Sequence, residues 1–168
     1  MDIRDAVPAD MPTVTDIYND AVLNTTAIWN DTKVDLDNRL AWRAERLGQG
    51  FPLIVAVDGD TVLGYATFGP WRPHDGYRHT VEHSVYVHKD QRGRGIGEAL
   101  MLALIERARA MGKHVMVAGI EANNTGSIRL HDKLGFENAG TVRQVGAKFG
   151  QWLDLTFLAL VLDGRETP

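Results

Sequence analysis

The stretch from Ser84 to Gly97 constrains the fold more than any other part of the chain. It starts as an alternating strand and continues into Arg92-Gly93-Arg94-Gly95-Ile96-Gly97, where every second residue is a glycine that leaves the backbone N–H groups uncovered. Apolar residues at helical spacing follow, so the loop lies where a helix begins. A helix N-terminus offers unpaired N–H donors and the positive end of the helix dipole. Arg92 and Arg94 add forked donors suited to phosphate oxygens, and the loop therefore predicts a site for a phosphate-bearing cofactor.

The composition limits the class of protein. The 168 residues suit a single domain over 1–168, since a chain of about 150 residues buries about two-thirds of its unfolded surface. A net charge of −4 gives no general basis for binding nucleic acid or an anionic membrane. The absence of cysteine excludes disulfides, thiolate metal sites and a cysteine nucleophile, and it fits a reducing compartment. With a charged N-terminus and no long apolar run, we expect a cytoplasmic protein.

The rest of the chain alternates between strand and helix patterns, which predicts an α/β (α+β) fold with a mixed sheet. A helix is entered at 8–10 and carries an apolar stripe through Val22, and Asp35 is a plausible N-cap for a second helix. Asp58-Gly59 predicts a hairpin turn. The other predicted helices cover 97–111 and 127–134, and the predicted strands cover 1–6, 51–57, 61–68, 79–88, 114–121, 137–145 and 152–162, with a turn over 146–150.

Several readings of the glycine loop compete. A Walker A motif requires a lysine after the glycines, and none follows Gly97. A dinucleotide fingerprint requires the spacing Gly-x-Gly-x-x-Gly after the first strand, whereas this loop has Gly-x-Gly-x-Gly in mid-chain. A plain glycine-rich turn with two solvated arginines stays open on the evidence of the loop alone.

The glycine loop is one of two motifs whose sequence and spacing can be compared with those of a known family. Arg92 to Gly97 resembles the Arg/Gln-x-x-Gly-x-Gly/Ala signature of the GNAT family of N-acetyltransferases, and Asn124 to Phe136 resembles the later Asn-x-x-Ser…Leu-Tyr/His-x-x-x-Gly-Phe element of that family. The opening residues 3–10 look like the family start. More narrowly, residues 80–87 and 146–154 are similar to the phosphinothricin and methionine sulfoximine N-acetyltransferase branch.

The resemblance implies the GNAT fold, with about seven strands and about four helices and a sheet splayed at the acetyl-CoA site. It also implies transfer of an acetyl group from acetyl-CoA to a primary amine. An exposed strand edge would supply the backbone partners that a pantetheine amide chain needs. Carried over by position, the cofactor-binding residues are Val85, Tyr86 and Val87 for pantetheine, Arg92, Gly93, Arg94, Gly95, Ile96 and Gly97 for pyrophosphate, and Asn124, Ser127 and Lys133 for the remainder of CoA.

The resemblance also implies two catalytic residues. Glu82 stands where the herbicide-acetylating relatives have a general base, although a carboxylate on a solvated strand face would show the same spacing. His131 stands where many relatives have a tyrosine that protonates the leaving thiolate, although a lone helix histidine is often structural. Without cysteine, we expect direct transfer in a ternary complex.

The acceptor is expected to be a small amino-acid-like amine such as methionine sulfoximine or phosphinothricin, which would make the reaction a detoxification. Such an acceptor needs a cation for its carboxylate and an apolar slot. The candidate substrate-binding residues are Trp29, Arg72, Asp75, Gly76, Tyr77, Arg78 and Glu82. Trp29 could equally well pack at the edge of the core instead of lining the site. Alternatives are a polyamine or protein N-terminus as acceptor, and a CoA-binding module without turnover.

Two further expectations concern metals and partners. The histidines outside the second motif have no metal-ligand spacing, so packing or solvent exposure is the better interpretation of His74, His79, His83 and His88. The resemblance implies a homodimer, to which the last strand could contribute Trp152, Phe157 and Leu158 unless these residues belong to the core.

Overall fold

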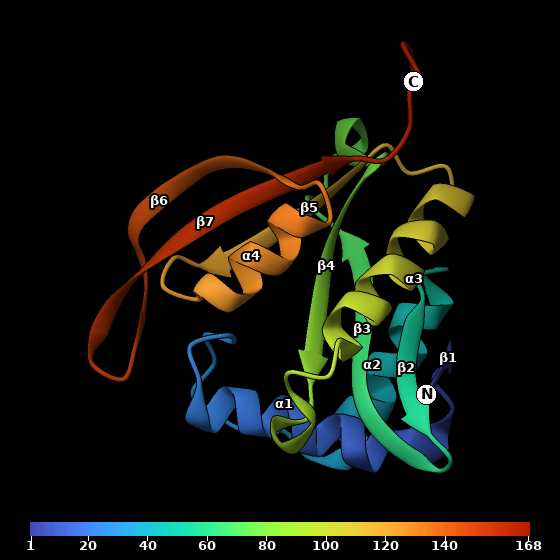
Figure 1. Cartoon of the computed structure of the whole chain (residues 1–168), viewed down its shortest axis with the longest axis vertical. Helices are drawn as coiled ribbons and strands as arrows, with labels where there is room; N and C mark the ends of the chain where they lie inside the picture. The colour runs from blue at the N-terminus through green and yellow to red at the C-terminus, as the bar shows by residue number, and fades with distance from the viewer.

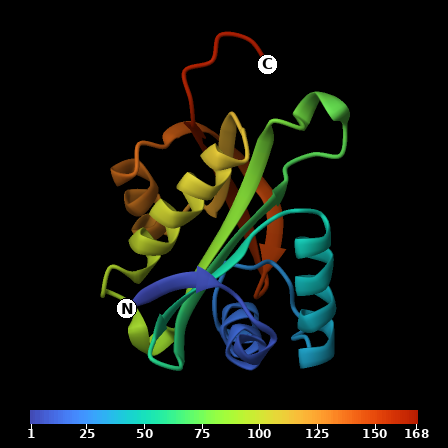
Figure 2. The same cartoon turned by 90° about the vertical axis from the view of Figure 1, so that its right-hand side faces the viewer.

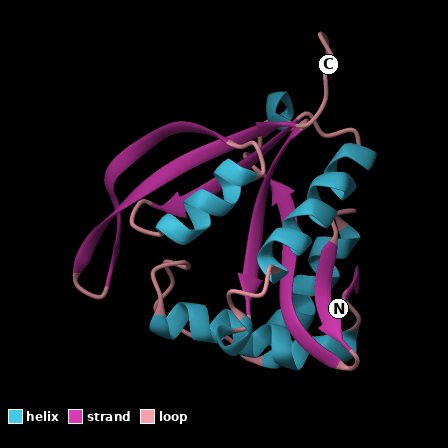
Figure 3. Ribbon diagram, viewed as in Figure 1, coloured by secondary structure: helices cyan, strands magenta, loops and turns pink.

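The computed structural model describes residues 1–168 and is built on one seven-stranded mixed sheet with the order β1-β2-β3-β4-β5-β7-β6 (Figures 1 and 3). The strands are β1 Asp2–Asp5, β2 Leu53–Asp58, β3 Thr61–Pro70, β4 Thr80–Val87, β5 Val115–Glu121, β6 Glu137–Lys148 and β7 Gln151–Val161. The α-helices are α1 Met11–Asn24, α2 Leu36–Gly48, α3 Ile96–Ala110 and α4 Thr125–Lys133, and single 3-10 turns cover Pro8–Asp10, Asp75–Tyr77 and Lys89–Gln91. The predicted fold class is confirmed.

Local signals account for most boundaries. The Asp35 carboxylate accepts a hydrogen bond from the Asn38 N–H at 2.8 Å, so the predicted N-cap of α2 is confirmed. The first hairpin differs by one residue, since Asp58 pairs with Thr61 and the loop consists of Gly59 and Asp60. The predicted turn at 146–150 is wrong in extent. β6 continues to Lys148, and the turn is made by Phe149 and Gly150, whose φ values are 52° and 70°.

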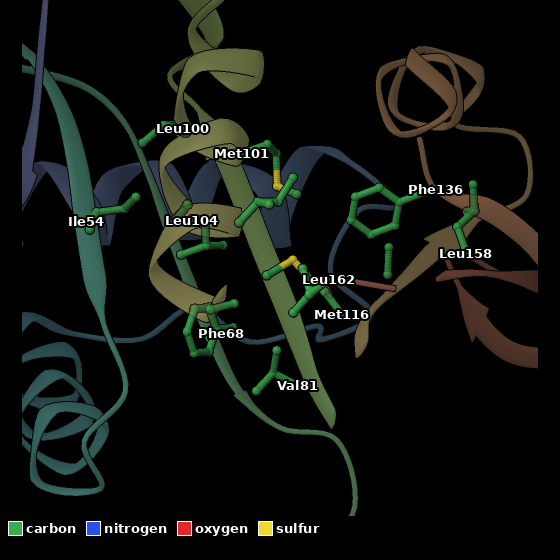
Figure 4. Packing of buried hydrophobic residues seen from close by; sticks show 14 of the residues in the cluster. Ile54, Phe68, Val81, Leu100, Met101, Leu104, Met116, Phe136, Leu158 and Leu162 are labelled. Atoms are coloured by element: carbon green, nitrogen blue, oxygen red, sulfur yellow. The ribbon is translucent and has the colours of Figure 1, made fainter. Parts of the chain in front are cut away.

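The two faces of the sheet carry separate cores. On one face, α3 packs Leu100 and Leu104 against Ile54 and Phe68 of β2 and β3, and Figure 4 shows this interdigitation. On the other face, α1 and α2 cover a smaller cluster that includes Tyr65. Figure 2 shows α3 and α4 on one side of the sheet and α1 and α2 on the other. Alternation along each strand divides the apolar residues between these clusters.

The sheet opens between β4 and β5. Parallel pairing joins only Thr80–Glu82 to Val115–Val117, while the β3 partner of β4 continues through to Val87. Beyond Glu82, the β5-side edge of β4 therefore has no strand partner. β5, β7 and β6 diverge from the rest of the sheet as an arm (Figure 1).

A buried lysine ties this arm to the loop that follows α1. Lys148, near the end of β6, is 3% exposed and donates to the carbonyl oxygens of Thr25 at 2.6 Å and Ile28 at 2.5 Å, with Ala21 at 3.4 Å. These acceptors surround the C-terminal end of α1, where a cation is electrostatically favoured. The loop holding Trp29 is fixed by a contact between segments more than 100 residues apart.

Replacing Lys148 with methionine is expected to destabilise the protein by about 2–4 kcal/mol, because buried carbonyls lose their donor. Urea denaturation followed by tryptophan fluorescence measures the change. Lys33→Met, at an exposed position, serves as the control. Equal unfolding midpoints for the two variants would contradict the anchoring role.

Candidate active site

The glycine loop has the backbone geometry of an anion site. Gly93 and Gly95 have φ values of 78° and 76°, and Gly95 is the N-cap of α3. Only glycine adopts this left-handed conformation without strain, apart from Asn and Asp. Nothing lies within 4 Å of the position that a side chain at either glycine would occupy. No side chain therefore covers the backbone at these two positions, and the first N–H groups of a helix have no partner within the helix.

Both arginines of the loop are exposed. The Arg92 guanidinium lies 3.8 Å from the Asp20 carboxylate, and Arg94 donates to the side-chain oxygen of Gln91. Contacts of this kind at the surface are weak and are readily exchanged for a phosphate. The loop thus combines backbone donors with two cations.

The other predicted cofactor residues lie on β4 and α4. Val85 and Val87 pack against the larger core, and the Tyr86 ring lies 5.4 Å from that of Tyr65, so the side chains hold the strand while its free edge stays unpaired. Two contacts hold the ends of α4. The Asn124 side chain accepts from the Ser127 N–H at 3.2 Å, and Lys133 donates to Glu98 of α3 at 2.7 Å.

Glu82 lies at the point where β4 and β5 separate. Its side chain is half-buried, and Oε1 lies 3.2 Å from the position that a Cβ of Gly119 would take on β5. Burial raises the pKa of the Glu82 carboxyl, and the nearby positive charge of Arg72 opposes that rise. A carboxylate with a raised pKa is a better proton acceptor than an ordinary glutamate. The geometry therefore fits a general base.

His131 is 1% exposed and pairs with His83 inside the core rather than facing solvent. Its Nδ1 lies 2.7 Å from the Ser127 carbonyl, which accepts only, and its Nε2 lies 2.9 Å from Nε2 of His83. His131 therefore donates through Nδ1 and accepts through Nε2, which leaves Nδ1 of His83 without a partner.

Burial lowers the pKa of both histidines, that of His83 to about 3. The pair is neutral near pH 7, so it stabilises the fold fully above pH 6.5 and does so less as the pH falls toward 3. Neither ring nitrogen of His131 has a proton directed at open space. These hydrogen bonds favour a packing role, and the proton-donor role stays a prediction.

The predicted substrate residues do not gather at one place. Arg72 lies close enough to Glu82 to lower its pKa, and its guanidinium stacks on Trp71 at 4.9 Å. The Tyr77 ring lies 5.4 Å from that of Trp71. Arg78 instead donates to the carbonyl of Asp75 at 2.9 Å, within the same loop.

Two other candidates make different contacts. Gly76 lines a hollow shared with His79, His114 and the C-terminal residues. Trp29 donates to the Thr26 carbonyl at 2.8 Å, and its ring packs against Gly146 of β6. None of these contacts joins Gly76, Arg78 or Trp29 to Glu82.

Sequence reasoning missed the arginines of α2. Arg39 stacks on the rings of Tyr18 and Trp42 at 4.3 and 4.5 Å, and Arg46 lies over Gly69 of β3. The spacing of Arg39, Trp42 and Arg46 places them on one helix face, which was the available signal. That face is turned toward the sheet face that carries Glu82.

Two further observations bear on the kind of site. No group of three or more His, Cys, Asp or Glu side chains lies close enough together to hold a metal ion. None of the helices combines the length and the apolar character required to cross a membrane.

Comparison with known proteins places this geometry in a family. The model of the Acetyltransferase (GNAT) family matches residues 14–136. An L-methionine sulfoximine/L-methionine sulfone acetyltransferase of Pseudomonas aeruginosa is 63% identical over 168 residues, covering 99% of this chain and 98% of the relative. A phosphinothricin N-acetyltransferase of Alcaligenes faecalis is 36% identical over 159 residues, covering 94% of this chain and 81% of the relative.

A solved structure agrees with these relatives. An acetyltransferase of Salmonella typhimurium, determined with its cofactor acetyl-CoA, superposes with a TM-score of 0.97 at 56% identity, covering 100% of this chain and 97% of that one. The family model, the relatives and the solved structure agree. The chain belongs to the GNAT family of acetyl-CoA-dependent N-acetyltransferases.

Proposed function

We propose that the protein acetylates the α-amine of a small amino acid of the methionine sulfoximine or phosphinothricin type. The observation that carries this proposal is the position of Glu82, half-buried where β4 and β5 separate and next to the unpaired edge of β4. The names of the relatives from Pseudomonas aeruginosa and Alcaligenes faecalis support the choice of acceptor.

The mechanism follows from what attack on a thioester requires. The N–H groups and arginines of the loop hold the pyrophosphate of acetyl-CoA, and the free edge of β4 hydrogen-bonds its pantetheine arm. Glu82 accepts a proton from the acceptor's ammonium group, directly or through water. The amine then attacks the acetyl carbonyl, so that a C–N bond forms and the C–S bond breaks. The second proton that the amine loses passes to the thiolate, so that CoA leaves as the thiol, and Glu82 returns its own proton to solvent. No covalent enzyme intermediate is involved.

Thiol release from acetyl-CoA, measured with a panel of amines, tests the proposal. We expect turnover with methionine sulfoximine, methionine sulfone or phosphinothricin, and little with spermidine. Arg72 and the α2 arginines make the surroundings of Glu82 unfavourable for a polycation. Thiol release with none of the amino acids, combined with tight CoA binding, would favour the CoA-binding module. The cytoplasmic location and the detoxifying role stay predictions.

We also propose a homodimer formed through the arm. β6 is the last strand of the sheet and leaves an unpaired edge, and a second copy could cover the exposed apolar side chains around it. These side chains are Val142, Val145, Phe149, Trp152 and Val161, with exposures from 46 to 70%. Leu158 is fully buried in the larger core, so its predicted part in such a contact is wrong; Phe157 is half-buried beside Gly119.

Trp152→Asp is expected to shift the protein from dimer to monomer at micromolar concentration, because it places a charge in the most exposed apolar position of the arm. Light scattering coupled to gel filtration measures the mass. Leu102→Asp makes the same change at an exposed position on α3 and should leave the mass unaltered. A monomeric unmutated protein would refute the dimer.

A further inference from the structure

The Arg46 guanidinium occupies the space that a side chain at Gly69 would fill, next to the proposed general base Glu82. Arg46 extends from α2 onto Gly69 of β3, and its Nη1 lies within the space that a Cβ at Gly69 would fill, with Cζ at 2.9 Å from that position. Gly69 is buried beneath it. An alanine at this position would force the arginine to move, so the position of the Arg46 guanidinium depends on the glycine at residue 69.

The strand register places this arrangement on the same face as Glu82. Gly69 and Glu82 are directly opposed in the antiparallel pair of β3 and β4. Opposed residues point to the same side of a sheet, with Cα atoms about 5 Å apart. The Glu82 side chain extends toward Gly119 on β5, with Oε1 at 3.2 Å from the position that a Cβ of Gly119 would take, whereas the Arg46 guanidinium lies over Gly69 on β3.

The Arg46 guanidinium makes no hydrogen bond or ion pair within the protein. Neighbouring Arg43 donates twice to the carbonyl of Ala6, whereas no hydrogen bond or ion pair involves the Arg46 head group, which lies 5.7 Å from the centre of the Trp42 ring. It is half-buried, and burial lowers its pKa. A cation partly removed from water and left unpaired gains more from a bound anion than an exposed one does.

We propose that Arg46 binds the carboxylate of the amino-acid acceptor while Glu82 serves its amine. This inference rests on the proposed function and deepens it. The two groups of an α-amino acid are attached to one carbon, so the cation and the base that recognise them must flank a single point on one face. Arg46 and Glu82 do so across β3 and β4, and the guanidinium fork matches a carboxylate.

Arg72 is the other cation near Glu82, and it is less suited to this task. It is exposed on the loop after β3, where water competes with a bound carboxylate and weakens the ion pair. Arg46 is already positioned by a helix and by the glycine beneath it. Arg72 then acts on Glu82 through its charge.

Steady-state kinetics of Arg46→Gln test this assignment. With methionine sulfoximine, we expect KM to rise about 10–100-fold with kcat within about threefold, since a charge-assisted contact to the bound carboxylate is lost. KM for acetyl-CoA stays unchanged. With the carboxamide of the same amino acid, which has no carboxylate, the variant and the unmutated enzyme should give equal kcat/KM.

Gly69→Ala provides a second variant that keeps the arginine. Its methyl group displaces the guanidinium, so KM for methionine sulfoximine should rise, and the double variant should be little worse than Arg46→Gln alone. If the increases in KM caused by Gly69→Ala and Arg46→Gln were additive in the double variant, the methyl group would not act through Arg46, and this would count against the proposal. Arg129→Gln removes the same charge from an exposed position on α4 and should change neither constant.

The outcomes separate the two proposals. If the unmutated enzyme turns over methionine sulfoximine but Arg46→Gln keeps its KM, or loses as much with the carboxamide, only this inference is wrong. If the unmutated enzyme acetylates no amino acid, the proposed function fails and the inference fails with it.

Discussion

Replacing Glu82 with glutamine is expected to lower kcat for the amino-acid acceptor by about 10²–10⁴-fold, because the attacking amine loses its proton acceptor. The amide is nearly the same size, and Glu82 makes no hydrogen bond that its loss would break. Binding of acetyl-CoA, measured by calorimetry, should be unchanged. Glu137→Gln, at an exposed position on β6, is the control for loss of one carboxylate. Normal turnover by Glu82→Gln would show that the amine reaches the site already deprotonated.

The pH dependence of kcat/KM provides a second test of the role of Glu82. In the proposed mechanism, activity requires ionised Glu82. Because burial raises the pKa of this carboxyl, the acidic limb of the kcat/KM profile should lie at a higher pH than an ordinary glutamate would give. Arg72 holds that pKa down, and Arg72→Gln should therefore move the limb further upward. In Glu82→Gln the limb should disappear, leaving the titration of the acceptor amine, which lies at higher pH because the carboxylate of a free amino acid stabilises the ammonium form.

Local sequence was sufficient for the elements and for the backbone conformation of the glycine loop. Alternation in β4, the glycines before α3 and the Asp35 cap are determined by residues close together in the chain. The glycine loop needs only its own backbone angles to expose N–H groups. Its position between a strand and a helix could therefore be predicted from spacing and from family resemblance.

The acceptor side depends on contacts that no local pattern contains. Arg46 reaches Gly69 from a separate helix, and Lys148 reaches carbonyls of a loop 120 residues earlier. His83 and His131, 48 positions apart, meet only because β4 and α4 enclose the same space. The sequence offered both Arg72 and Arg78 as cations for the acceptor carboxylate, but a local hydrogen bond holds Arg78 to Asp75. Fold-level packing determines which cation lies beside Glu82.

The pair Gly95→Asn and Gly95→Asp should separate geometry from charge at the cofactor loop. Both side chains tolerate the left-handed conformation, both are good N-caps, and both would enter the open space at the start of α3. They differ only in charge. We expect KM for acetyl-CoA to rise up to about tenfold for asparagine and about 10²–10³-fold further for aspartate, since a carboxylate within 4–5 Å of a phosphate costs about 3–4 kcal/mol at an effective dielectric constant near 20.

Measuring both KM values at several salt concentrations checks the comparison of Gly95→Asn with Gly95→Asp. Raising the ionic strength screens the repulsion between the aspartate and the pyrophosphate, so the ratio of the two KM values should fall as salt is added. The asparagine variant should follow the salt dependence of the unmutated enzyme, since its loop has the same charge. Equal KM values for the two variants at low salt would place the pyrophosphate away from Gly95 and would return the loop to the status of a glycine-rich turn with two solvated arginines.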